Sequence, residues 1–527
     1  MSELLEINNL KIAVKNQHGL NHIVKGLTFK ILKGQTIALL GESGCGKSIT
    51  AYSILQQLPN NIFCSSNSNI FFNGKDLLRK SEYEMQKIRR DDIAIIYQEP
   101  MTSLNPTLTI KNQCLEILRT KKISYKGKIS KIKEMLSEVG LNNHDYLLSN
   151  YPHQLSGGMR QRIMIVMALL KEPKLLIADE PTTALDVTIQ KQILLLLKRL
   201  QEKYHMAILL ITHDFGVVYE MANEVCVMQD GVLVEKGNTK EVIHDPKHEY
   251  TKKLLAAIPK FEDNPNKDFK ESSSNILNIN KLKIYYPIRA GILKRIKSYV
   301  KAVDDVSFNL PLGKTVAIVG ESGSGKSTLA KGLVKLLDIT SGEVILNNKP
   351  LKNLSNIAFR KDVQIIFQDP YSSLNPKMLI KDIISEGPRA LGINFSETDV
   401  VSLLDQVGLP SNAKSRYPHE FSGGQRQRIS IARALAVNPK VIICDEITSA
   451  LDVSIQDKIL KLLLDLQKEK NLSYLFITHN ISVVAYIADK VIVMNQGVMV
   501  ELGPVRDVLF NPQEEYTQKL LSSVLTI

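Results

Sequence analysis

Long apolar segments are missing from this sequence of 527 residues. No stretch approaches the roughly 18 to 20 uninterrupted apolar residues that span a bilayer. The first residues, Met1–Val14, also lack the basic segment and the following apolar core of a signal peptide. Neither a membrane span nor export is therefore expected, and the sequence predicts a chain that stays in the cytoplasm.

Cysteine is scarce as well. None of the five cysteines forms a CxxC pair with another, so their spacing gives little support to a zinc or iron–sulfur site. Widely separated cysteines in a chain without an export signal are typically reduced, and we expect buried thiols. The five residues are Cys45, Cys64, Cys114, Cys226 and Cys444.

Acidic residues are too few to balance the basic ones, and the formal net charge is +13. A positive balance of this size suits nucleic acid, an anionic membrane surface or a well-solvated, lysine-rich surface. The basic clusters are short, as in Leu293–Lys301 (LKRIKSYVK), and they contain few aromatic residues on which bases could stack. The solvated surface is therefore the favoured interpretation, and no nucleic-acid partner is expected.

The sequence contains an internal repeat. Tyr151–Ile163 (YPHQLSGGMRQRI) returns as Tyr417–Ile429 (YPHEFSGGQRQRI). Leu175–Gln190 (LLIADEPTTALDVTIQ) returns as Val441–Gln456 (VIICDEITSALDVSIQ). Two copies of one domain are therefore predicted.

The spacing between the copies changes between the phosphate loop and the serine–glycine motif. The numbers of Ser422 and Ser156 differ by 266, whereas those of Lys326 and Lys47 differ by 279. The first copy therefore carries a net 13 additional residues between its lysine and its serine (279 − 266). Elsewhere the copies keep register, as two folded domains of one kind would.

A polar segment separates the two copies. Pro259–Asn275 (PKFEDNPNKDFKESSSN) contains two prolines and a serine run, and it has no apolar period of a helix. Such a composition is typical of a linker. We therefore predict a first domain over 1–260, a linker over 261–275 and a second domain over 276–527.

Apolar runs alternate with amphipathic stretches of helical length within each copy. The runs at 174–178 (KLLIA), 314–319 (KTVAIV) and 441–444 (VIIC) look like strands that are buried on both faces. Ile189–Tyr204 (IQKQILLLLKRLQEKY) is one of the helical stretches. This alternation predicts an α/β fold with a mostly parallel core sheet in each copy.

A glycine-rich loop follows an apolar run in each copy. The loops read GESGCGKS at Gly41–Ser48 and GESGSGKST at Gly320–Thr328, and both match the pattern GxxxxGK[ST]. The glycines let main-chain N–H groups turn toward phosphate oxygens. The helix that follows adds its positive N-terminal end. Both loops are therefore predicted to bind a phosphate group.

Each residue of the two loops is a candidate nucleotide ligand. The lysines, Lys47 and Lys326, are expected to reach the β- and γ-phosphates, and the hydroxyls of Ser48 and Ser327 are expected to ligate Mg²⁺. A glycine-rich turn without a ligand is the alternative, which two matches after apolar strands disfavour. The candidates are Gly41, Glu42, Ser43, Gly44, Cys45, Gly46, Lys47, Ser48 and Ile49 of the first copy, and Gly320, Glu321, Ser322, Gly323, Ser324, Gly325, Lys326, Ser327 and Thr328 of the second.

Two acidic residues follow another apolar run in each copy. Asp179 with Glu180, and Asp445 with Glu446, emerge at the C-terminal end of a predicted strand. Open α/β sheets bind their ligands at this edge. The aspartate there can hold Mg²⁺, and the glutamate can polarise the attacking water as a general base. The alternative is a helix N-cap followed by an acid that complements the helix dipole.

A serine and two glycines precede a long helical stretch in each copy. These residue types at a helix start make a second anion-binding site. Two phosphate loops and two such motifs favour an arrangement in which each motif closes on the γ-phosphate held by the opposite copy. The residues are Ser156, Gly157, Gly158, Ser422, Gly423 and Gly424.

The order of these motifs resembles the nucleotide-binding domain of ABC transporters. The phosphate loop, a glutamine, the serine–glycine motif, the acidic pair, an ALD triplet and a histidine follow one another in each copy. The resemblance covers nearly the whole chain twice. It implies two tandem P-loop domains, each with a helical subdomain, which sandwich two ATP molecules head to tail within the chain. The additional matching residues are Gln98, Gln368, His213 and His479, with Asp186 and Asp452 at the seam.

The resemblance assigns roles residue by residue. Glu180 and Glu446 are the implied catalytic bases, and His213 and His479 are implied to contact the γ-phosphate. One site would join the first loop to Ser422 and Gly424, and the other would join the second loop to Ser156 and Gly158. The implied ligands of Mg²⁺ are Ser48, Gln98 and Asp179 in one site and Ser327, Gln368 and Asp445 in the other.

Finer motifs resemble one group within the family. Gln98–Pro106 (QEPMTSLNP) and Gln368–Pro376 (QDPYSSLNP) resemble the Q-loops of peptide and nickel importers, and His244–Pro259 resembles their C-terminal extension. Tyr285–Ile296 (YYPIRAGILKRI) and the fused arrangement resemble the ATPase of Yej-type importers, which take up microcin C and oligopeptides. This implies two transmembrane permease subunits, an extracytoplasmic binding protein and a peripheral place on the cytoplasmic face of the inner membrane.

Three positions depart from the family pattern. Val14 stands where many members place an aromatic ring under adenine, whereas Tyr286 fills that place in the second copy. We therefore expect weaker nucleotide binding at the first loop. Ile447 replaces the proline that follows the first catalytic glutamate, and Met159 replaces the usual glutamine or glutamate after the serine–glycine motif. Neither change removes a catalytic glutamate, so hydrolysis of ATP is expected at both sites.

The sequence leaves the cargo open, because cargo contacts lie on other chains. A motor subunit for the import of oligopeptides or peptide-like compounds, such as dipeptides or microcin C-like molecules, is the predicted function. An importer of glutathione or nickel is an alternative within the family. A tandem-ABC translation or ribosome factor is an alternative from another class, but such proteins usually have a long, charged, helical linker and lack SLNP Q-loops.

Overall fold

The structure, a computed structural model, describes residues 2–16, 19–98, 103–183, 185–260, 264, 274–290, 295–449 and 451–525. These residues form two units. The first is built mainly from Met1–Leu185 and Ile189–Ala256, and the second mainly from Ala257–Val524. The predicted linker, 261–275, lies almost wholly outside the described residues. Asn264 within it is buried, and its side-chain amide donates hydrogen bonds to the carbonyls of Ala485 (2.8 Å) and Ala488 (3.0 Å).

The first unit contains a six-stranded sheet with the order β11-β10-β3-β9-β8-β7. Only the β10–β11 pair at its edge is antiparallel; the other pairings are parallel. Every residue of β3 and β8 is buried, which explains their uninterrupted apolar sequences. The strands are β3 (Thr36–Leu40), β7 (Ile93–Ile96), β8 (Leu175–Asp179), β9 (Ala207–Thr212), β10 (Glu224–Gln229) and β11 (Val232–Asn238).

The second unit repeats this sheet with the order β17-β18-β19-β14-β20-β21. Again only the edge pair, β20–β21, is antiparallel. The predicted α/β fold with a mostly parallel core sheet is therefore confirmed in both copies. The strands are β14 (Thr315–Val319), β17 (Val363–Ile366), β18 (Val441–Asp445), β19 (Ser473–Ile477), β20 (Lys490–Asn495) and β21 (Val498–Pro504).

Each unit also has an antiparallel sheet, which the sequence reasoning missed. Its orders are β2-β1-β5-β6, with β4 paired to β1, and β13-β12-β15-β16. Register shifts interrupt the long pairs β1–β2 and β12–β13, so no strict alternation marks these strands in the sequence. The strands are β1 (Glu3–Asn16), β2 (Gly19–Leu32), β4 (Ile62–Cys64), β5 (Asn69–Phe72), β6 (Lys75–Asp76), β12 (Asn275–Ala290), β13 (Arg295–Pro311), β15 (Ser341–Leu346) and β16 (Lys349–Pro350).

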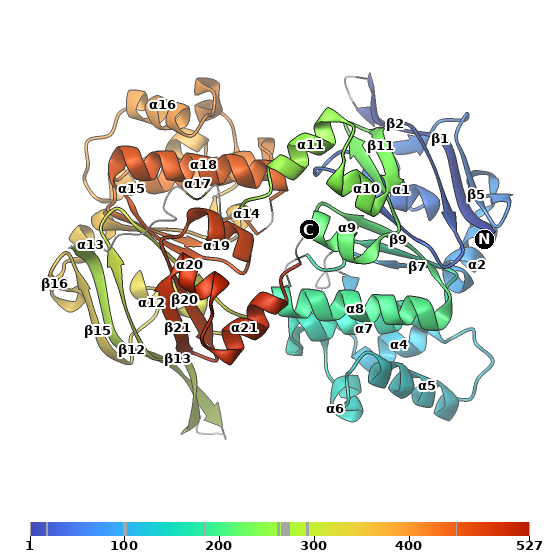
Figure 1. The fold of residues 1–527 in the computed structure, drawn as a ribbon, viewed down its shortest axis with the longest axis horizontal. Coiled ribbons are helices and arrows are strands. Elements are labelled where there is room, and N and C mark those ends of the chain that lie inside the picture. Colours follow the sequence, from blue (N-terminus) through green and yellow to red (C-terminus); the bar gives the residue numbers. More distant parts are fainter. Residues whose placement is uncertain are drawn as a thin grey trace. The chain divides into compact units, whose positions relative to one another are not determined.

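Helices accompany both sheets (Figure 1). The predicted helix at Ile189–Tyr204 is confirmed as the larger part of α8. In the first unit the helices are α1 (Lys47–Ile54), α2 (Glu82–Asp91), α4 (Ile110–Ile117), α5 (Tyr125–Glu138), α6 (His144–Ser149), α7 (Gly157–Leu169), α8 (Val187–Tyr204), α9 (Phe215–Met221), α10 (Thr239–His244) and α11 (Glu249–Ala256). In the second they are α12 (Lys326–Leu333), α13 (Asn356–Asp362), α14 (Pro370–Ser373), α15 (Ile380–Ala390), α16 (Glu397–Gln406), α17 (Gly423–Leu435), α18 (Val453–Lys470), α19 (Ile481–Ile487), α20 (Val505–Phe510) and α21 (Glu515–Ser522).

The helix that follows each phosphate loop lies in an apolar core shared by the two sheets of its unit. In the first unit this core contains Leu5 of β1, Leu39 of β3 and Ile54 of α1. In the second it contains Leu277 of β12 and Leu329 of α12. Because burial of apolar surface is the main stabilising contribution to folding, this packing holds the loop at the end of its strand.

Some of the additional residues of the first copy lie after α1. Phe72 lies 25 residues after Lys47 (72 − 47), whereas the corresponding Leu346 lies 20 residues after Lys326 (346 − 326). The segment before Phe72 contains β4, which pairs with β1. The insertion therefore extends the antiparallel sheet rather than the phosphate loop.

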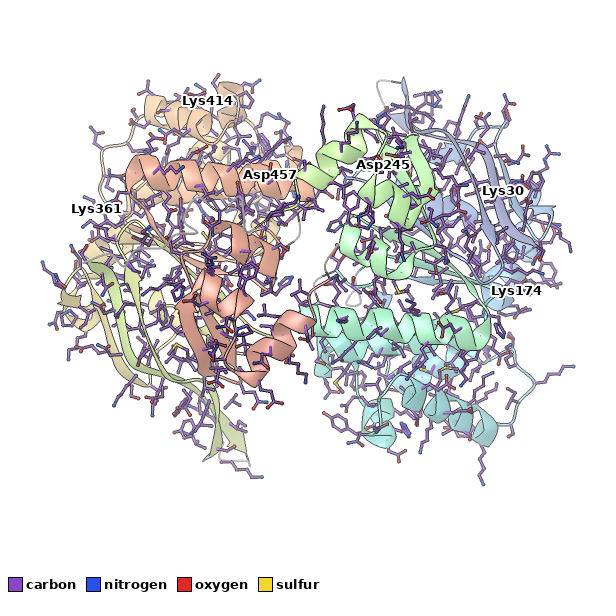
Figure 2. The ribbon with its side chains drawn as sticks, viewed as in Figure 1. Lys30, Lys174, Asp245, Lys361, Lys414 and Asp457 are labelled. Carbon is purple, nitrogen blue, oxygen red and sulfur yellow. The ribbon has the colours of Figure 1, made fainter. Side chains whose placement is uncertain are left out.

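Charged side chains lie on the outer surface of each unit, and Figure 2 labels six of them. Lys30 lies 2.9 Å from Glu3, and Lys174 lies 2.7 Å from Asp92. These lysines are 44% and 59% exposed, so solvent screens their ion pairs and each contributes little to stability. The arrangement agrees with a well-solvated basic surface.

The cysteines are placed as their spacing indicates. Four of the five cysteines are buried, Cys64 is half-buried, and all five are free thiols. Burial raises the pKa of the Cys64 thiol to about 11. Within the described residues, no helix combines the length and the apolar composition needed to cross a membrane.

Candidate functional site

The phosphate loops connect the buried strands β3 and β14 to the helices α1 and α12. The first glycine of each loop, Gly41 or Gly320, has a φ of +154° or +148°. A Cβ atom at Gly41 would lie 2.3 Å from the main-chain oxygen of Met228, and one at Gly320 would lie 2.1 Å from that of Met494. Glycine is therefore required where the loop leaves the strand, because no side chain fits against the neighbouring strand.

The lysine of each loop turns back to the start of that loop. Lys47 Nζ donates hydrogen bonds to the carbonyls of Gly41 and Glu42, both over 2.7 Å. Lys326 Nζ donates to the carbonyls of Gly320 (2.8 Å) and Glu321 (2.9 Å). Both lysines are 5% exposed. Burial lowers the pKa of Lys326, although the charge of Glu446 opposes that shift.

The serine that follows each lysine meets the aspartate that ends a strand. Ser48 Oγ donates a hydrogen bond to Asp179 Oδ1 over 3.0 Å, and Ser327 Oγ donates to Asp445 Oδ1 over 3.0 Å. Residues more than a hundred positions apart in the sequence are thereby brought together at the same sheet edge. A hydroxyl and a carboxylate side by side supply two oxygen ligands of the kind that Mg²⁺ takes.

Both aspartates are difficult to ionise in this environment. Burial raises the pKa of Asp179 to about 6; the Ser48 hydrogen bond opposes this shift, and the neighbouring Glu180 charge adds to it. Burial also raises the pKa of Asp445, with Ser327 opposing the shift in the same way. A cation beside these carboxylates would favour their charged form.

The glutamate after each aspartate has a left-handed backbone conformation. The φ angles of Glu180 and Glu446 are +46° and +50°. Their main-chain N–H groups donate to the carbonyls of Ile211 (2.8 Å) and Ile477 (2.9 Å), so each glutamate is held to the neighbouring strand. The acidic pair is not a helix N-cap, because α8 begins only at Val187.

Side chains from three other segments converge on Glu180. Gln98 Nε2 donates to Glu180 Oε2 over 2.8 Å, and Thr183 Oγ1 donates to the same oxygen over 2.8 Å. His213 Nδ1 lies 3.1 Å from Glu180 Oε1. Burial alone would raise the pKa of Glu180, but the His213 and Thr183 interactions outweigh it and lower this pKa below its ordinary value. The carboxylate is therefore ionised at neutral pH.

The second copy holds its glutamate with fewer groups. Gln368 Nε2 donates to Glu446 Oε2 over 2.8 Å, and His479 Nδ1 lies 3.4 Å from the same oxygen. Ser449, the counterpart of Thr183, donates its hydroxyl to the main-chain carbonyl of Glu446 over 2.9 Å instead. Burial would raise the pKa of Glu446, but His479 outweighs it and the net direction is downward.

Thr183 and Ser449 are site residues that the sequence reasoning missed. Each is the third residue after the glutamate, at matching places in the repeat. A hydroxyl in both copies at this position was the available signal. Its meaning depends on the left-handed turn at the glutamate, which sequence patterns alone do not reveal.

The serine–glycine motifs begin α7 and α17, as predicted. Ser156 Oγ accepts the N–H of Met159 over 3.4 Å, and Ser422 Oγ accepts that of Gln425 over 3.4 Å. Gln425 returns the interaction, because its Oε1 accepts the N–H of Ser422 over 3.0 Å. Met159 has no oxygen with which to close this capping box. The departure from the family pattern thus removes one hydrogen bond at the start of α7.

The two glycines of each motif have different surroundings. A Cβ at Gly158 would lie 3.0 Å from Ile189 Cγ2 of α8, and one at Gly424 would lie 2.5 Å from Ile455 Cγ2 of α18. The second glycine therefore allows close packing between helices. A Cβ at Gly423 would meet no atom within 4 Å, and one at Gly157 would meet only Leu185, at 3.9 Å. The first glycine leaves the helix start open to an anion.

Val14 and Tyr286 occupy equivalent places on β1 and β12. Val14 is nine residues after Leu5 (14 − 5), and Tyr286 is nine residues after Leu277 (286 − 277). Tyr286 pairs with Val300 of β13, and its side chain is 39% exposed. An exposed ring on one strand and an aliphatic side chain on the other agree with the predicted difference between the copies, which itself stays a prediction.

Several predicted features fall on residues that the structure does not describe. They are 99–102 of the first Q-loop, 291–294 of the segment YYPIRAGILKRI, and Ala184 and Ala450 of the ALD triplets. The seam positions of Asp186 and Asp452 and the pairing of each loop with the opposite motif concern both units together. They stay predictions.

The ligand set at each sheet edge fits ATP with a single Mg²⁺. Among the residues with a described placement, no group of three or more His, Cys, Asp or Glu side chains is arranged to hold a metal. Mg²⁺ at nucleotide sites is typically held by one or two carboxylates together with phosphates and water, so it needs no such cluster. The Ser48–Asp179 and Ser327–Asp445 pairs supply that smaller set.

Comparison with known proteins agrees with this geometry. The family model "ABC transporter" matches residues 24–183 and 303–449. The model "Oligopeptide/dipeptide transporter, C-terminal region" matches residues 234–287 and 500–527. Both copies therefore carry both family features.

Two curated relatives match nearly the whole chain. The peptidoglycan transport ATP-binding protein YejF of Agrobacterium fabrum is 44% identical over 532 residues, which cover 99% of this chain and 97% of that protein. The glutathione import ATP-binding protein GsiA of Escherichia coli K12 is 44% identical over 557 residues, which cover 99% of this chain and 89% of that protein. Among solved structures, cbiO1 of Clostridium perfringens matches 45% of this chain and 92% of its own, with 29% identity and a TM-score of 0.40.

Proposed function

Because this chain belongs to the ABC transporter family as a tandem ATP-binding protein of the oligopeptide/dipeptide type, we propose that it is the motor subunit of an importer for oligopeptides or peptide-like compounds. One observation carries the proposal of two working ATPase sites. In each copy a glutamate, buried in the first and half-buried in the second, is held by a glutamine and a histidine next to a serine–aspartate pair and a phosphate loop. Proteins with such cassettes hydrolyse ATP, and this chain is an ATPase.

The residues around each phosphate loop have distinct roles in binding. The main-chain N–H groups of the loop and the ammonium group of Lys47 or Lys326 would bind the phosphates. Ser48, Asp179 and Gln98 would hold Mg²⁺ in the first site, and Ser327, Asp445 and Gln368 would hold it in the second. Bound there, the ion would neutralise phosphate charge and orient the γ-phosphate.

Glu180 and Glu446 would act as general bases. Each carboxylate has a lowered pKa and is ionised at neutral pH, so it can accept a proton from the attacking water. Gln98 and His213 hold the two oxygens of Glu180, which fixes the direction of the carboxylate. His213 and His479 would also contact the γ-phosphate once nucleotide is bound.

The output of hydrolysis would be a change of conformation. ATP that binds a closed pair of domains more tightly than an open pair shifts the equilibrium toward closure. We propose, as the family resemblance implies, that each phosphate loop closes against the serine–glycine motif of the other copy. Hydrolysis would remove the bridging phosphate and allow reopening.

The proposed partners are two transmembrane permease subunits and a substrate-binding protein. Short helices of the permeases would bind near Gln98 and Gln368, which places this chain on the cytoplasmic face of the inner membrane. The names of the two relatives, which refer to peptidoglycan and glutathione, support peptide-like cargo. The match of both copies to the oligopeptide/dipeptide transporter C-terminal region favours an importer over a ribosome factor.

Copurification with the permeases and the binding protein tests this function. The complex, reconstituted in lipid nanodiscs, should hydrolyse ATP faster when the binding protein is loaded with a short peptide. The matched control is a complex that carries Glu180→Gln and Glu446→Gln, which should bind ATP without this stimulation. Association with ribosomes instead of membranes, or stimulation by nickel alone, would overturn the assignment.

A further inference from the structure

The C-terminal helix of the second unit contacts its phosphate loop. Tyr516, the second residue of α21, accepts a hydrogen bond at its hydroxyl oxygen from the main-chain N–H of Glu321 over 3.2 Å. Glu321 is the second residue of the loop. Helix α21 lies within the matched oligopeptide/dipeptide transporter C-terminal region.

The first unit has the same juxtaposition. Tyr250 of α11 matches Tyr516 in the repeat (516 − 250 = 266), and Glu42 is the second residue of the first loop. The Tyr250 hydroxyl is buried and makes no hydrogen bond to the described residues, and burial together with the nearby charge of Glu42 raises its pKa. A tyrosine thus lies beside the same loop position in both copies, although the two residues are 208 positions apart in the first copy (250 − 42) and 195 in the second (516 − 321).

The peptide groups of Glu321 connect Tyr516 to Lys326, the lysine of the second phosphate loop. The N–H of Glu321 donates to Tyr516, and its carbonyl accepts a hydrogen bond from Lys326 Nζ over 2.9 Å. In the first copy the carbonyl of Glu42 accepts from Lys47 Nζ over 2.7 Å. One loop residue is therefore fixed on one side by the C-terminal helix and on the other by the lysine that is to bind phosphate.

A glutamate on the edge strand anchors the turn that precedes each of these helices. The carboxylate of Glu501, on β21, accepts the main-chain N–H groups of Gln513 (2.9 Å) and Glu514 (3.4 Å). The ring of Tyr516 also packs against an apolar core that includes Val319, the last residue of β14. The position of the hydroxyl is thus set by the sheet. In the first copy Glu235 of β11 accepts the N–H groups of Lys247 (2.7 Å) and His248 (3.2 Å).

We infer that Tyr516 is a positioning residue that holds the second peptide of the second phosphate loop and thereby sets the nucleotide affinity of that site. Tyr250 has the matching place beside the first loop. The inference rests on the proposed function, because it takes the loops as ATP sites. It gives the C-terminal region a role within the motor itself. Any partner that displaces α21 would weaken ATP binding at the second loop.

Tyr516→Phe tests the inference most directly, because phenylalanine keeps the ring in the core and removes only the hydroxyl. Binding of N-methylanthraniloyl-ATP with Mg²⁺ is measured in a chain that also carries Lys47→Ala, so that the second loop dominates the signal. We expect a Kd about threefold to tenfold higher, as the loss of one net hydrogen bond implies. Turnover at saturating ATP is measured in a chain that carries Tyr516→Phe alone, and it should change by less than about twofold.

Hydrogen exchange without nucleotide gives a second readout. The amide of Glu321 should exchange faster in Tyr516→Phe than in the parent, because its acceptor is gone. Tyr83→Phe is the matched control, since Tyr83 is 67% exposed on α2, and it should change neither the Kd nor this exchange. Tyr516→Ala should additionally lower the thermal midpoint, because it removes the ring from the core.

A double-mutant cycle separates positioning from general loosening. Glu501→Ala should weaken nucleotide binding in the parent but add little in Tyr516→Phe, because both changes act through the same hydroxyl. Additive effects, or an unchanged Kd in Tyr516→Phe while the parent binds nucleotide, would overturn the inference. If the parent itself fails to bind nucleotide, the proposed function fails, and the exchange of Glu321 still decides whether the contact exists.

Discussion

The hydroxyl of Thr183 donates a hydrogen bond to the carboxylate of Glu180 over 2.8 Å. The corresponding hydroxyl in the second copy, that of Ser449, donates to the main-chain carbonyl of Glu446 instead. The two glutamates are therefore held differently, although the residues of the two sites match one another. Direction and acidity of a general base both affect its efficiency, so the copies are expected to respond differently to loss of this hydroxyl.

Thr183→Val is expected to lower turnover at the first site by about twofold to tenfold, the effect of one net hydrogen bond. It should be measured in a chain that carries Glu446→Gln, so that only the first site turns over. The matched control is Ser449→Ala in a chain that carries Glu180→Gln. Because Ser449 does not touch the carboxylate, its effect should be smaller, and equal effects would contradict this account.

Replacement of both glutamates tests the assignment of the general bases. Glu180→Gln together with Glu446→Gln should lower ATP turnover at least about a hundredfold, the low end of general-base contributions. Glutamine keeps the size of the side chain, so ATP binding should persist. Steady-state hydrolysis and nucleotide binding are measured on the same preparation, and turnover near that of the parent would exclude these residues as bases.

The adenine side of the two sites is expected to differ because Tyr286 has Val14 as its counterpart. Loss of one stacked ring costs about 1 to 3 kcal/mol by analogy with base–aromatic stacking. Tyr286→Val should therefore weaken ATP binding at the second site, and Val14→Tyr should strengthen it at the first. Affinities measured in separate Lys47→Ala and Lys326→Ala chains isolate the two loops, and equal affinities in these two chains would contradict the expectation.

In the second unit the buried carboxylate of Asp489 pairs with Lys314, which is 27% exposed, and we expect this pair to make the stability of the second unit depend on pH in a way that the first does not. Asp489 is fully buried; its carboxylate accepts the N–H of Thr315 over 2.8 Å and lies 3.0 Å from Lys314 Nζ. In the first unit the amide oxygen of Asn223 accepts the N–H of Thr36 over the same 2.8 Å. The neutral amide thus makes the same main-chain hydrogen bond without a buried charge.

The direction in which the free energy of unfolding changes with pH follows from the pKa of Asp489. Burial raises this pKa above its ordinary value of 3.8, although Thr315 and Lys314 oppose the shift. Below pH 3.8 both the folded and the unfolded state hold the proton. As the pH rises from there through the raised pKa, the unfolded state releases its proton first, so the free energy of unfolding falls.

Replacement of both residues of the pair by their first-unit counterparts should remove this pH dependence. Lys314→Gln with Asp489→Asn copies the Gln35 and Asn223 arrangement of the first unit. The thermal midpoint should then decline less as the pH rises from about 4, and stability at neutral pH should be unchanged or up to about 4 kcal/mol higher. Calorimetry between pH 4 and 8 measures this.

The reciprocal exchange is the matched control. Gln35→Lys with Asn223→Asp introduces the ion pair into the first unit and should add a pH-dependent decline there. Parallel pH profiles for the parent and both exchanged chains would show that Asp489 does not titrate as described.

The core sheets and the ligand-binding edge could be predicted from the sequence because their signals are local. Five consecutive buried residues in β3 or β8 give an uninterrupted apolar run, and a glycine-rich loop or an acidic pair follows directly. Strand ends in a parallel sheet share one edge, which brings Ser48 and Asp179 together. Such contacts can be predicted from the order of the strands and loops along the chain alone.

Other parts depend on structure that no local pattern encodes. The long strands β1 and β12 have interrupted registers, so their alternation is lost and the antiparallel sheets were missed. The contact of Thr183 with Glu180 depends on a left-handed backbone at residue 180, and that of Tyr516 with Glu321 depends on how a distant helix packs. Both require the three-dimensional arrangement.

The left-handed backbone at Glu180 and Glu446 has an evolutionary consequence. A residue other than glycine costs about 1 to 2 kcal/mol in this conformation, whereas glycine adopts it freely and asparagine tolerates it. Folding alone therefore favours variants that have lost the carboxylate. After a duplication, a copy released from selection would drift toward a more stable and inactive site. That both copies retain glutamate is what natural selection for hydrolysis at each of them would produce.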